Sequence, residues 1–287
     1  TDANNEVVEG FSGSTPENNN GTTASVVSQL RPYPDLVIST LTVDPTAVET
    51  GQSVTVFWHI ANTGTDAVRR AFSDRVRVVK ASSGLVLVDR TLSYDPAVDG
   101  DITVGAARDR LVTITIPDGS ASVGNLTVSV TADQANNIFE YNAGGTGETN
   151  NTASAALSAT LAPYPDLVAS NVTAPSQTIA DPAHVTIGWT VTNSGNRAAQ
   201  PGNWFDVVVA SSDTTFGNGD DRELARFEQT APLAVGGSYA RSESIILPPA
   251  FTGRFHLFVK ADGSGGIFED GVEGNNVSEA PNLFDVM

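Results

Sequence analysis

The ten residues SVTVFWHIAN, at positions 53–62, decide the fold of this chain. Their side chains alternate along the segment between apolar and mostly polar positions. The apolar positions are Val54, Val56, Trp58 and Ile60, and the intervening ones are Thr55, Phe57 and His59. A period of two residues indicates a half-buried antiparallel strand with one packed face and one face in water. We therefore expect Trp58 to anchor a hydrophobic core.

The chain contains this pattern twice, as part of a longer internal repeat. Three landmarks recur in the same order at a nearly constant spacing of 129 to 131 residues. They are SVTVFWHIAN and HVTIGWTVTN at 184–193, RPYPDLV at 31–37 and APYPDLV at 162–168, and GNLTVSV at 124–130 and GRFHLFV at 253–259. Such regular self-similarity indicates a tandem duplication, with Trp189 as the counterpart of Trp58.

The opening residues fit a third register of the same repeat. TDANNEVVEG at 1–10 and the residues after it run parallel to TADQANNIFEY at 131–141 and its continuation. Residues 1–31 are therefore predicted to be the C-terminal strand segment of a preceding repeat. The two complete domains are then predicted to be residues 32–162 and 163–287.

Each unit is predicted to be an all-β, immunoglobulin-like sandwich. Clusters of Gly, Pro, Asn and Asp interrupt β-branched runs about every ten residues, and no stretch supports a helix of useful length. Short strands at this spacing in a unit of this size are typical of two packed antiparallel sheets. In the first unit seven strands are expected, near residues 35–44, 53–62, 74–81, 85–91, 109–116, 124–132 and 151–161.

Composition excludes several classes of partner and site. The chain has 287 residues, with 15 Lys+Arg against 33 Asp+Glu and a formal charge of −18. Nucleic acid and anionic membrane surfaces would repel such a chain. It has no cysteine, which excludes disulfides and thiolate chemistry. No stretch approaches the ~20 apolar residues of a membrane span, so we expect no membrane insertion.

The segments LRPYPDLV and LAPYPDLV precede the two units. Each places a tyrosine between two prolines, which leaves few free backbone torsions. A short and stiff junction is predicted, with Tyr33 and Tyr164 packed between adjacent domains.

These residues together resemble the CARDB family, the cell-adhesion-related domain found in bacteria. The resemblance is carried by PDLV at the start of each unit, by VTVFWHIANTG and VTIGWTVTNSG, and by VTAD…IFE…ETNN and VKAD…IFE…EGNN at the end. It implies tandem extracellular sandwiches of bacterial or archaeal surface proteins, and it carries over no catalytic residue.

The residues themselves also offer no catalytic arrangement. His59, His184 and His256 fall on different strands, point away from the predicted core and do not recur between units. The chain has no GxSxG elbow, no HExxH motif and no phosphate-binding glycine loop. We therefore expect no enzymatic activity.

An acid and amide cluster recurs at the end of each unit. It consists of Asp133, Glu140, Glu148, Asn150 and Asn151 in the first unit, Asp262, Glu269, Glu273, Asn275 and Asn276 in the second, and Asp2, Glu9, Glu17, Asn18 and Asn19 in the opening segment. Calcium takes six to eight oxygen ligands of this kind, so a calcium ion is a candidate cofactor. The favoured interpretation is that the side chains fix a turn, because their spacing matches no established calcium loop.

Two further features suggest ligands. Asp213, Asn218, Asp220 and Asp221 form a second oxygen-rich loop, for which a solvated hairpin tip is the favoured interpretation over calcium. Phe57 and Phe258 lie on the outward phase of their strands, and Trp204 and Phe205 begin another strand. Exposed aromatic rings of this kind would suit a glycan ligand.

The sequence thus predicts a structural or adhesive repeat segment of an extracellular surface, matrix or filament protein. It would act as a stiff spacer, with neighbouring repeats or copies of the same protein as partners, and residues 1–31 could polymerise it by completing another sandwich. The alternative is an accessory glycan- or protein-binding module of a secreted enzyme or adhesin. Loss of glycan binding on replacing Phe57 or Trp204 would favour that alternative.

Overall fold

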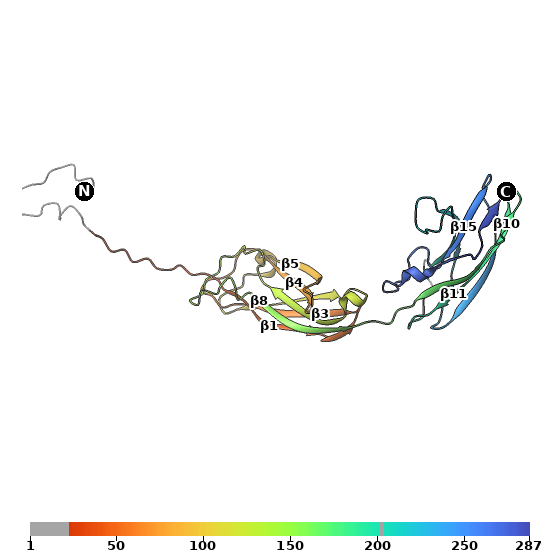
Figure 1. The fold of residues 1–287 in the computed structure, drawn as a ribbon. Helices are drawn as coiled ribbons and strands as arrows, with labels where there is room; N and C mark the ends of the chain where they lie inside the picture. Colours follow the sequence, from red (N-terminus) through yellow and green to blue (C-terminus); the bar gives the residue numbers. More distant parts are fainter. Residues whose placement is uncertain (1–22, 201, 203) are drawn as a thin grey trace, which may run out of the picture.

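The chain folds into two β-sandwiches that lie end to end (Figure 1). The computed structural model describes residues 23–200, 202 and 204–287. Residues 23–31 run as an extended, exposed segment that leads into the first sandwich and form no strand. The remainder of the predicted segment 1–31 lies outside the described residues. None of the helices in the described part of the chain is long and apolar enough to cross a membrane.

The first sandwich packs a three-stranded sheet, β1-β3-β6, against a five-stranded sheet, β2-β8-β7-β4-β5. β3 pairs antiparallel with β1 from Thr55 to Asn62 and with β6 from Ser53 to Ala61. The elements are β1 (Leu36–Asp44), β2 (Ala47–Glu49), β3 (Ser53–Asn62), β4 (Phe72–Lys80), β5 (Val86–Tyr94), α1 (Pro96–Asp99), β6 (Ala107–Thr115), η2 (Ser120–Ser122), β7 (Gly124–Thr131) and β8 (Thr152–Thr160).

The second sandwich repeats this topology. Its sheets are β9-β11-β14 and β10-β17-β15-β12-β13, and β16 also pairs with β15. The elements are β9 (Leu167–Thr173), β10 (Gln177–Thr178), β11 (His184–Asn193), β12 (Phe205–Ser211), β13 (Arg222–Glu228), β14 (Ser238–Ile246), β15 (Gly253–Lys260), η3 (Glu273–Asn276), β16 (Val277–Glu279) and β17 (Phe284–Val286).

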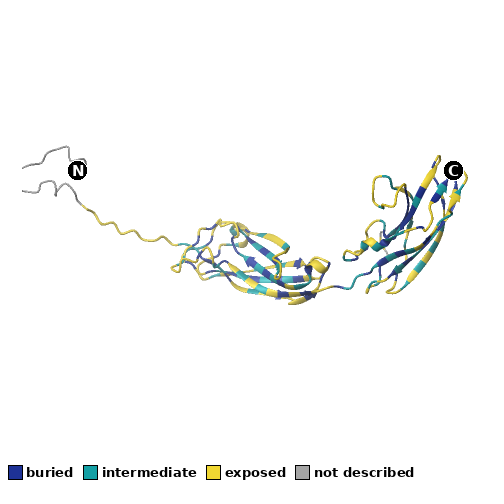
Figure 2. Ribbon diagram, viewed as in Figure 1, coloured by how far each residue is buried: buried dark blue, intermediate teal, exposed yellow. Residues whose placement is uncertain are grey.

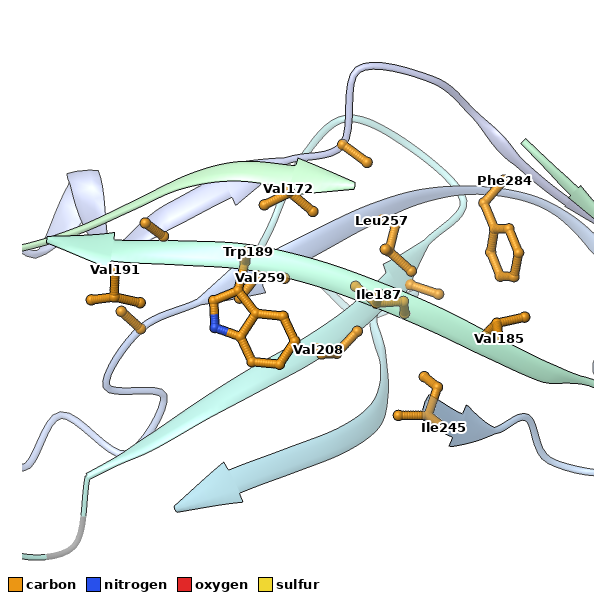
Figure 3. Close-up of a cluster of buried hydrophobic side chains, with 14 of the residues drawn as sticks. Val172, Val185, Ile187, Trp189, Val191, Val208, Ile245, Leu257, Val259 and Phe284 are labelled. Atoms are coloured by element: carbon orange, nitrogen blue, oxygen red, sulfur yellow. The ribbon is translucent and has the colours of Figure 1, made fainter. Parts of the chain in front are cut away.

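The alternation along β3 and β11 determines the two cores. Trp58 is fully buried, and Trp189 is 2% exposed. Buried residues alternate with half-exposed ones along both strands, as the colouring of Figure 2 shows. In the second core, Trp189 lies among Val208, Leu257 and Val259 from the facing sheet (Figure 3). The predicted anchoring role of both tryptophans is confirmed.

The predicted strands of the first unit lie within three residues of the observed ones, and the short β2 was missed. Two predictions about aromatic side chains were wrong. Trp204 is fully buried and belongs to the second core. Phe258 does point outward but is 4% exposed, because Phe216 of the β12–β13 loop packs against it with ring centroids 5.7 Å apart. Neither ring is therefore available to a glycan.

Candidate functional site

The first acid of each recurring cluster closes a turn. Asp133, at φ 43°, accepts hydrogen bonds from the backbone N–H groups of Asn137 at 3.0 Å and Ile138 at 2.7 Å. Asp262, at φ 46°, does the same in the second sandwich, with Ile267 N at 2.7 Å. A side-chain acceptor that satisfies successive N–H groups stabilises a tight turn. The arrangement supports the turn interpretation at these two positions.

The second acid ties the end of the first unit to its first strand. Glu140 is 3% exposed, and its carboxylate accepts hydrogen bonds from Leu36 N and from Asn151 Nδ2, the latter at 2.9 Å. Glu148 in turn accepts from Glu140 N at 2.6 Å. Burial raises the pKa of Glu140 to about 8, although both hydrogen bonds oppose the rise. The raised pKa favours the neutral form of this buried carboxyl group at neutral pH.

Sequence reasoning missed one member of this cluster, the aspartate of PDLV. Asp35 is 4% exposed and accepts hydrogen bonds from Asn150 Nδ2 at 2.9 Å, Thr63 Oγ1 at 2.8 Å and Asn142 Nδ2 at 3.2 Å. Its counterpart Asp166 accepts from Asn275 Nδ2 at 2.8 Å. The recurrence of this aspartate in both PDLV segments was the signal that could have identified it.

Raised pKa values predict that the fold loses stability as pH rises. Burial raises the pKa of Glu140 to about 8, of Glu269 to about 7 and of Asp74 to about 6. Above pH 4.5 the folded chain then binds more protons than the unfolded one, so the free energy of unfolding falls up to about pH 8. Guanidinium denaturation at pH 5, 7 and 9 should show this decline. Glu140→Gln should flatten it, whereas the exposed control Glu49→Gln should not; a rise in stability from pH 5 to 9 would contradict the prediction.

The second sandwich arranges its cluster more loosely around Glu269. This residue is 1% exposed. The Leu167 N–H and the Asn276 side chain lie close enough to its carboxylate to oppose the rise in its pKa, but neither makes a well-formed hydrogen bond to it. The side-chain oxygens of Asn275 and Asn276 are also buried, and no donor of the described chain reaches them in hydrogen-bonding geometry. Asn276 Nδ2 donates to Glu273 at 3.2 Å. Burial raises the pKa of Glu269 to about 7 and also raises the pKa of Glu273.

Calcium binding stays a prediction that the turn interpretation argues against. Across residues 23–200, 202 and 204–287, no group of three or more His, Asp or Glu is arranged to hold a metal ion. We expect millimolar calcium to leave the melting temperature unchanged, because Asp133, Glu140 and Asp262 already accept hydrogen bonds from the protein. A calcium-dependent rise in the melting temperature that Glu269→Gln abolishes and the control Glu49→Gln keeps would instead support a bound calcium ion.

Each core contains a triad of an aspartate, a tryptophan and an arginine, which sequence reasoning also missed. Asp74 is fully buried, accepts a hydrogen bond from Trp58 Nε1 at 3.3 Å and lies 3.2 Å from Arg110 Nε. In the second core Asp206 accepts from Trp189 Nε1 at 2.9 Å and lies 3.5 Å from Arg241 Nε. The repeated acids were visible in the sequence one repeat apart, on the inward phase of their strands.

The histidines and the second oxygen-rich loop lie apart from one another. His59 contacts Asp109 and His256 contacts Glu279, on the outer faces of different sandwiches. In the β12–β13 loop, Asp220 accepts hydrogen bonds from Ser211 Oγ at 3.0 Å and Ser212 N at 2.7 Å. The loop bonds to itself and shields Phe258. These contacts within the loop support the interpretation of Asp213, Asn218, Asp220 and Asp221 as a hairpin tip.

The joint between the sandwiches brings distant residues together. The Tyr164 hydroxyl donates to Asp118 Oδ1 at 2.9 Å, accepts from Gly119 N at 3.1 Å and lies 2.7 Å from Thr50 Oγ1. Thr50 Oγ1 also accepts from Ala162 N at 3.0 Å. The tyrosine of the second unit is thus fastened to the far end of the first, and the prediction that it packs between domains is confirmed.

A second set of contacts completes this joint. The Tyr164 ring meets Phe268 edge-on with centroids 5.0 Å apart, and Asp270 Oδ1 accepts from Ser120 N at 2.8 Å. Gly119 has φ +91°, and a Cβ there would lie 2.6 Å from Asp270 Oδ1 and 3.3 Å from Phe268. Glycine is required at this position both for its conformation and for the close approach.

Comparison with known proteins gives one family and distant structural neighbours. The CARDB family model matches residues 33–155 and 164–280, most of the chain. A CARDB domain from Pyrococcus furiosus, whose crystal structure is described as a complex with di-metal ions, is 20% identical, covering 47% of this chain and 100% of that chain (TM-score 0.32). The solution NMR structure of that domain covers 46% and 100% at the same identity and score.

A red sea bream transglutaminase is 12% identical, with 88% of this chain and 31% of that chain covered and a TM-score of 0.28. No curated protein matches the chain.

Proposed function

The chain belongs to the CARDB family, and from that premise we propose that it is a structural repeat segment of a bacterial or archaeal extracellular protein. Each sandwich would act as one stiff unit, and the joint around Tyr164 would keep successive units in line. CARDB domains are non-catalytic immunoglobulin-like modules, which agrees with a mechanical role.

The observation that carries this proposal is the joint itself. Relative motion is the default between two domains joined by a short segment. Here the linking segment contains Pro163 and Pro165, and the Tyr164 hydroxyl makes three contacts with the preceding unit. Hydrogen bonds of this kind each contribute about 0.5–1.5 kcal/mol, so together they can hold one orientation.

Solution scattering tests the spacer function. We expect the profile of the full chain to fit one end-to-end arrangement of the sandwiches. Tyr164→Ala should require an ensemble of interdomain angles, because it removes both the hydroxyl contacts and the ring contact with Phe268. Tyr33→Ala, the equivalent change at the other end of the first sandwich, is the matched control and should leave the profile unchanged. A wild-type profile that already needs the broad ensemble would contradict the proposal.

We propose an extracellular location for the chain, which its composition supports. A charge of −18 and the absence of cysteine suit a repeat protein exposed outside the cell. Antibodies against the sandwiches should label intact cells of the source organism as strongly as permeabilised ones. Labelling that appears only after permeabilisation would place the chain inside.

A binding module is the alternative, and one surface favours it. Phe57 on β3 is half-buried and pairs across the sheet with Leu111, which is 63% exposed. Trp204 and Phe258 are buried, whereas Phe57 keeps part of its ring exposed, so a glycan could stack on it. Glycan-array binding that Phe57→Ala abolishes would favour this module over a passive spacer. Polymerisation through residues 1–31 also stays a proposal, which the native mass of the chain tests.

A further inference from the structure

The first sandwich has an aromatic end face that the described residues of the chain leave uncovered. The face consists of Tyr33, Phe139 and Tyr141, with ring centroids 5.0 Å apart for Tyr33–Phe139 and 6.0 Å for Tyr33–Tyr141. Phe139 is 63% exposed and Tyr141 41% exposed. Exposed rings grouped in this way at the end of a domain mark an interaction surface.

The equivalent face of the second sandwich is already an interface. Tyr164 and Phe268 are the counterparts of Tyr33 and Phe139, with the same centroid distance of 5.0 Å. The Tyr164 hydroxyl bonds to Asp118 and Gly119 of the end loop of the first sandwich, and the nearby Asp270 accepts from Ser120 N. The aromatic end face therefore has the geometry of a joint whose other half is not supplied by the described residues.

Hollows beside the two faces support the equivalence. In the second sandwich a hollow of about 250 Å³ is lined by Tyr164, Ile267 and Phe268, and Asp118 of the first sandwich forms part of its wall. In the first sandwich a hollow of about 230 Å³ is lined by the counterparts, Tyr33, Ile138 and Phe139. The described chain places no acidic loop from another sandwich in that second hollow.

Charge around this hollow suits an incoming carboxylate. Arg31, Arg69 and Arg70 line it, in a chain that has only 15 cationic residues and a net charge of −18. The Arg31 guanidinium stacks over the Tyr33 ring at 4.8 Å, and Arg69 pairs with Asp66 at 2.9 Å. In the joint that is formed, Arg197 lines the hollow together with Asp118. An aspartate entering beside these arginines would find a favourable potential.

We propose that the aromatic end face docks the end loop of a preceding CARDB-type sandwich that carries a threonine and an Asp-Gly-Ser sequence at the positions of Thr50 and Asp118–Ser120. This inference rests on the spacer function proposed above. The Tyr33 hydroxyl would bond to the threonine, the aspartate and the glycine N–H, as Tyr164 does.

A second copy of this chain does not offer that loop. The end loop of the first sandwich is already bound to Tyr164. At the end of the second sandwich, the corresponding positions are Asp181, Pro249 and Ala250. The Ala250 N–H, which would have to meet the tyrosine hydroxyl, already donates to Asp181 Oδ1 at 2.9 Å. The occupant must therefore be a different sandwich with the loop chemistry of the first one.

The test inserts a second copy of residues 32–162 directly after Ala162 in the full chain, so that an aromatic end face follows a suitable end loop. Small-angle scattering of this three-sandwich chain is expected to fit a single rod. Tyr33→Phe with Phe139→Ala in the inserted copy should cause loss of the single-rod fit. The same pair of substitutions in the first copy, whose face is uncovered, should change nothing.

Each outcome is decisive. Equal scattering profiles for the two substituted chains would overturn the inference. A concentration-dependent dimer of the unmodified chain that Phe139→Ala abolishes would also overturn it, because a second copy of this chain would then be the occupant. Circular dichroism would establish that the substituted sandwiches stay folded. If Tyr164→Ala loosens the natural chain while the inserted-copy variant stays a rod, only this inference fails and the spacer function stands.

Discussion

Trp58→Ala is expected to lower the free energy of unfolding of the first sandwich by about 3–5 kcal/mol. The indole is fully buried at the centre of the core, so the substitution leaves a large cavity. It also removes the Nε1 donor from Asp74, which is fully buried. Such a loss is a large share of the ~5–15 kcal/mol that stabilises a typical domain. Guanidinium denaturation followed by circular dichroism measures it.

Two controls separate the components of this effect. Phe57→Ala changes the adjacent outward-facing ring and should cost far less, because it opens no cavity in the core. Trp189→Ala should reproduce the loss in the second sandwich, where the indole is buried in the core and donates to the equivalent aspartate, Asp206. If Trp58→Ala destabilised the sandwich no more than Phe57→Ala does, the assignment of the inward face of β3 would be wrong.

Arg110→Met is expected to destabilise the first sandwich by about 3–5 kcal/mol at pH 8. The Arg110 side chain is 13% exposed and gives Asp74 its cationic partner at 3.2 Å. Burial already raises the pKa of Asp74 to about 6, and Arg110 opposes that rise. Without the arginine the pKa rises further, so the penalty for ionising Asp74 grows above pH 6. Denaturation midpoints at pH 5 and pH 8 check this.

The sign of the pH effect makes this prediction specific. At pH 5 Asp74 is largely protonated in the fold, so the variant should lose markedly less stability than at pH 8. Arg241→Met, in the second sandwich, should cost less than Arg110→Met, because the Tyr239 hydroxyl also donates to Asp206 at 2.7 Å. An equal loss at both pH values would contradict the ionic role of Arg110 and leave only its packing.

The fold could be predicted closely because alternation and internal repetition are strong signals in β-proteins. The strict two-residue period of β3 gave both its bounds and its buried face, and the repeat transferred the result to β11. Aromatic positions were harder, since strand phase says which side a residue faces and not what covers that side. Phe258 faces outward as expected, yet the β12–β13 loop buries it under Phe216.

The candidate sites were less predictable for a related reason. Sequence spacing identified the recurring acids, but not which N–H groups would reach them. Asp133 bonds to the turn that follows it, whereas Glu140 reaches Leu36, more than a hundred residues earlier. Asp74 was missed because a charged residue on an inward strand phase is understood only once its partners Trp58 and Arg110 are placed around it. Long-range polar pairing of this kind depends on the packing of the two sheets.

The central claim is that the Tyr164 joint holds the two sandwiches in one orientation, and a distance distribution tests it most directly. Because the chain has no cysteine, nitroxide labels can be attached solely at Thr113→Cys and Ser244→Cys, exposed and equivalent positions on β6 and β14. Pulsed electron spin resonance should give one narrow distribution for the wild-type joint, and Tyr164→Ala should broaden it. A wild-type distribution as broad as that of Tyr164→Ala would contradict the account.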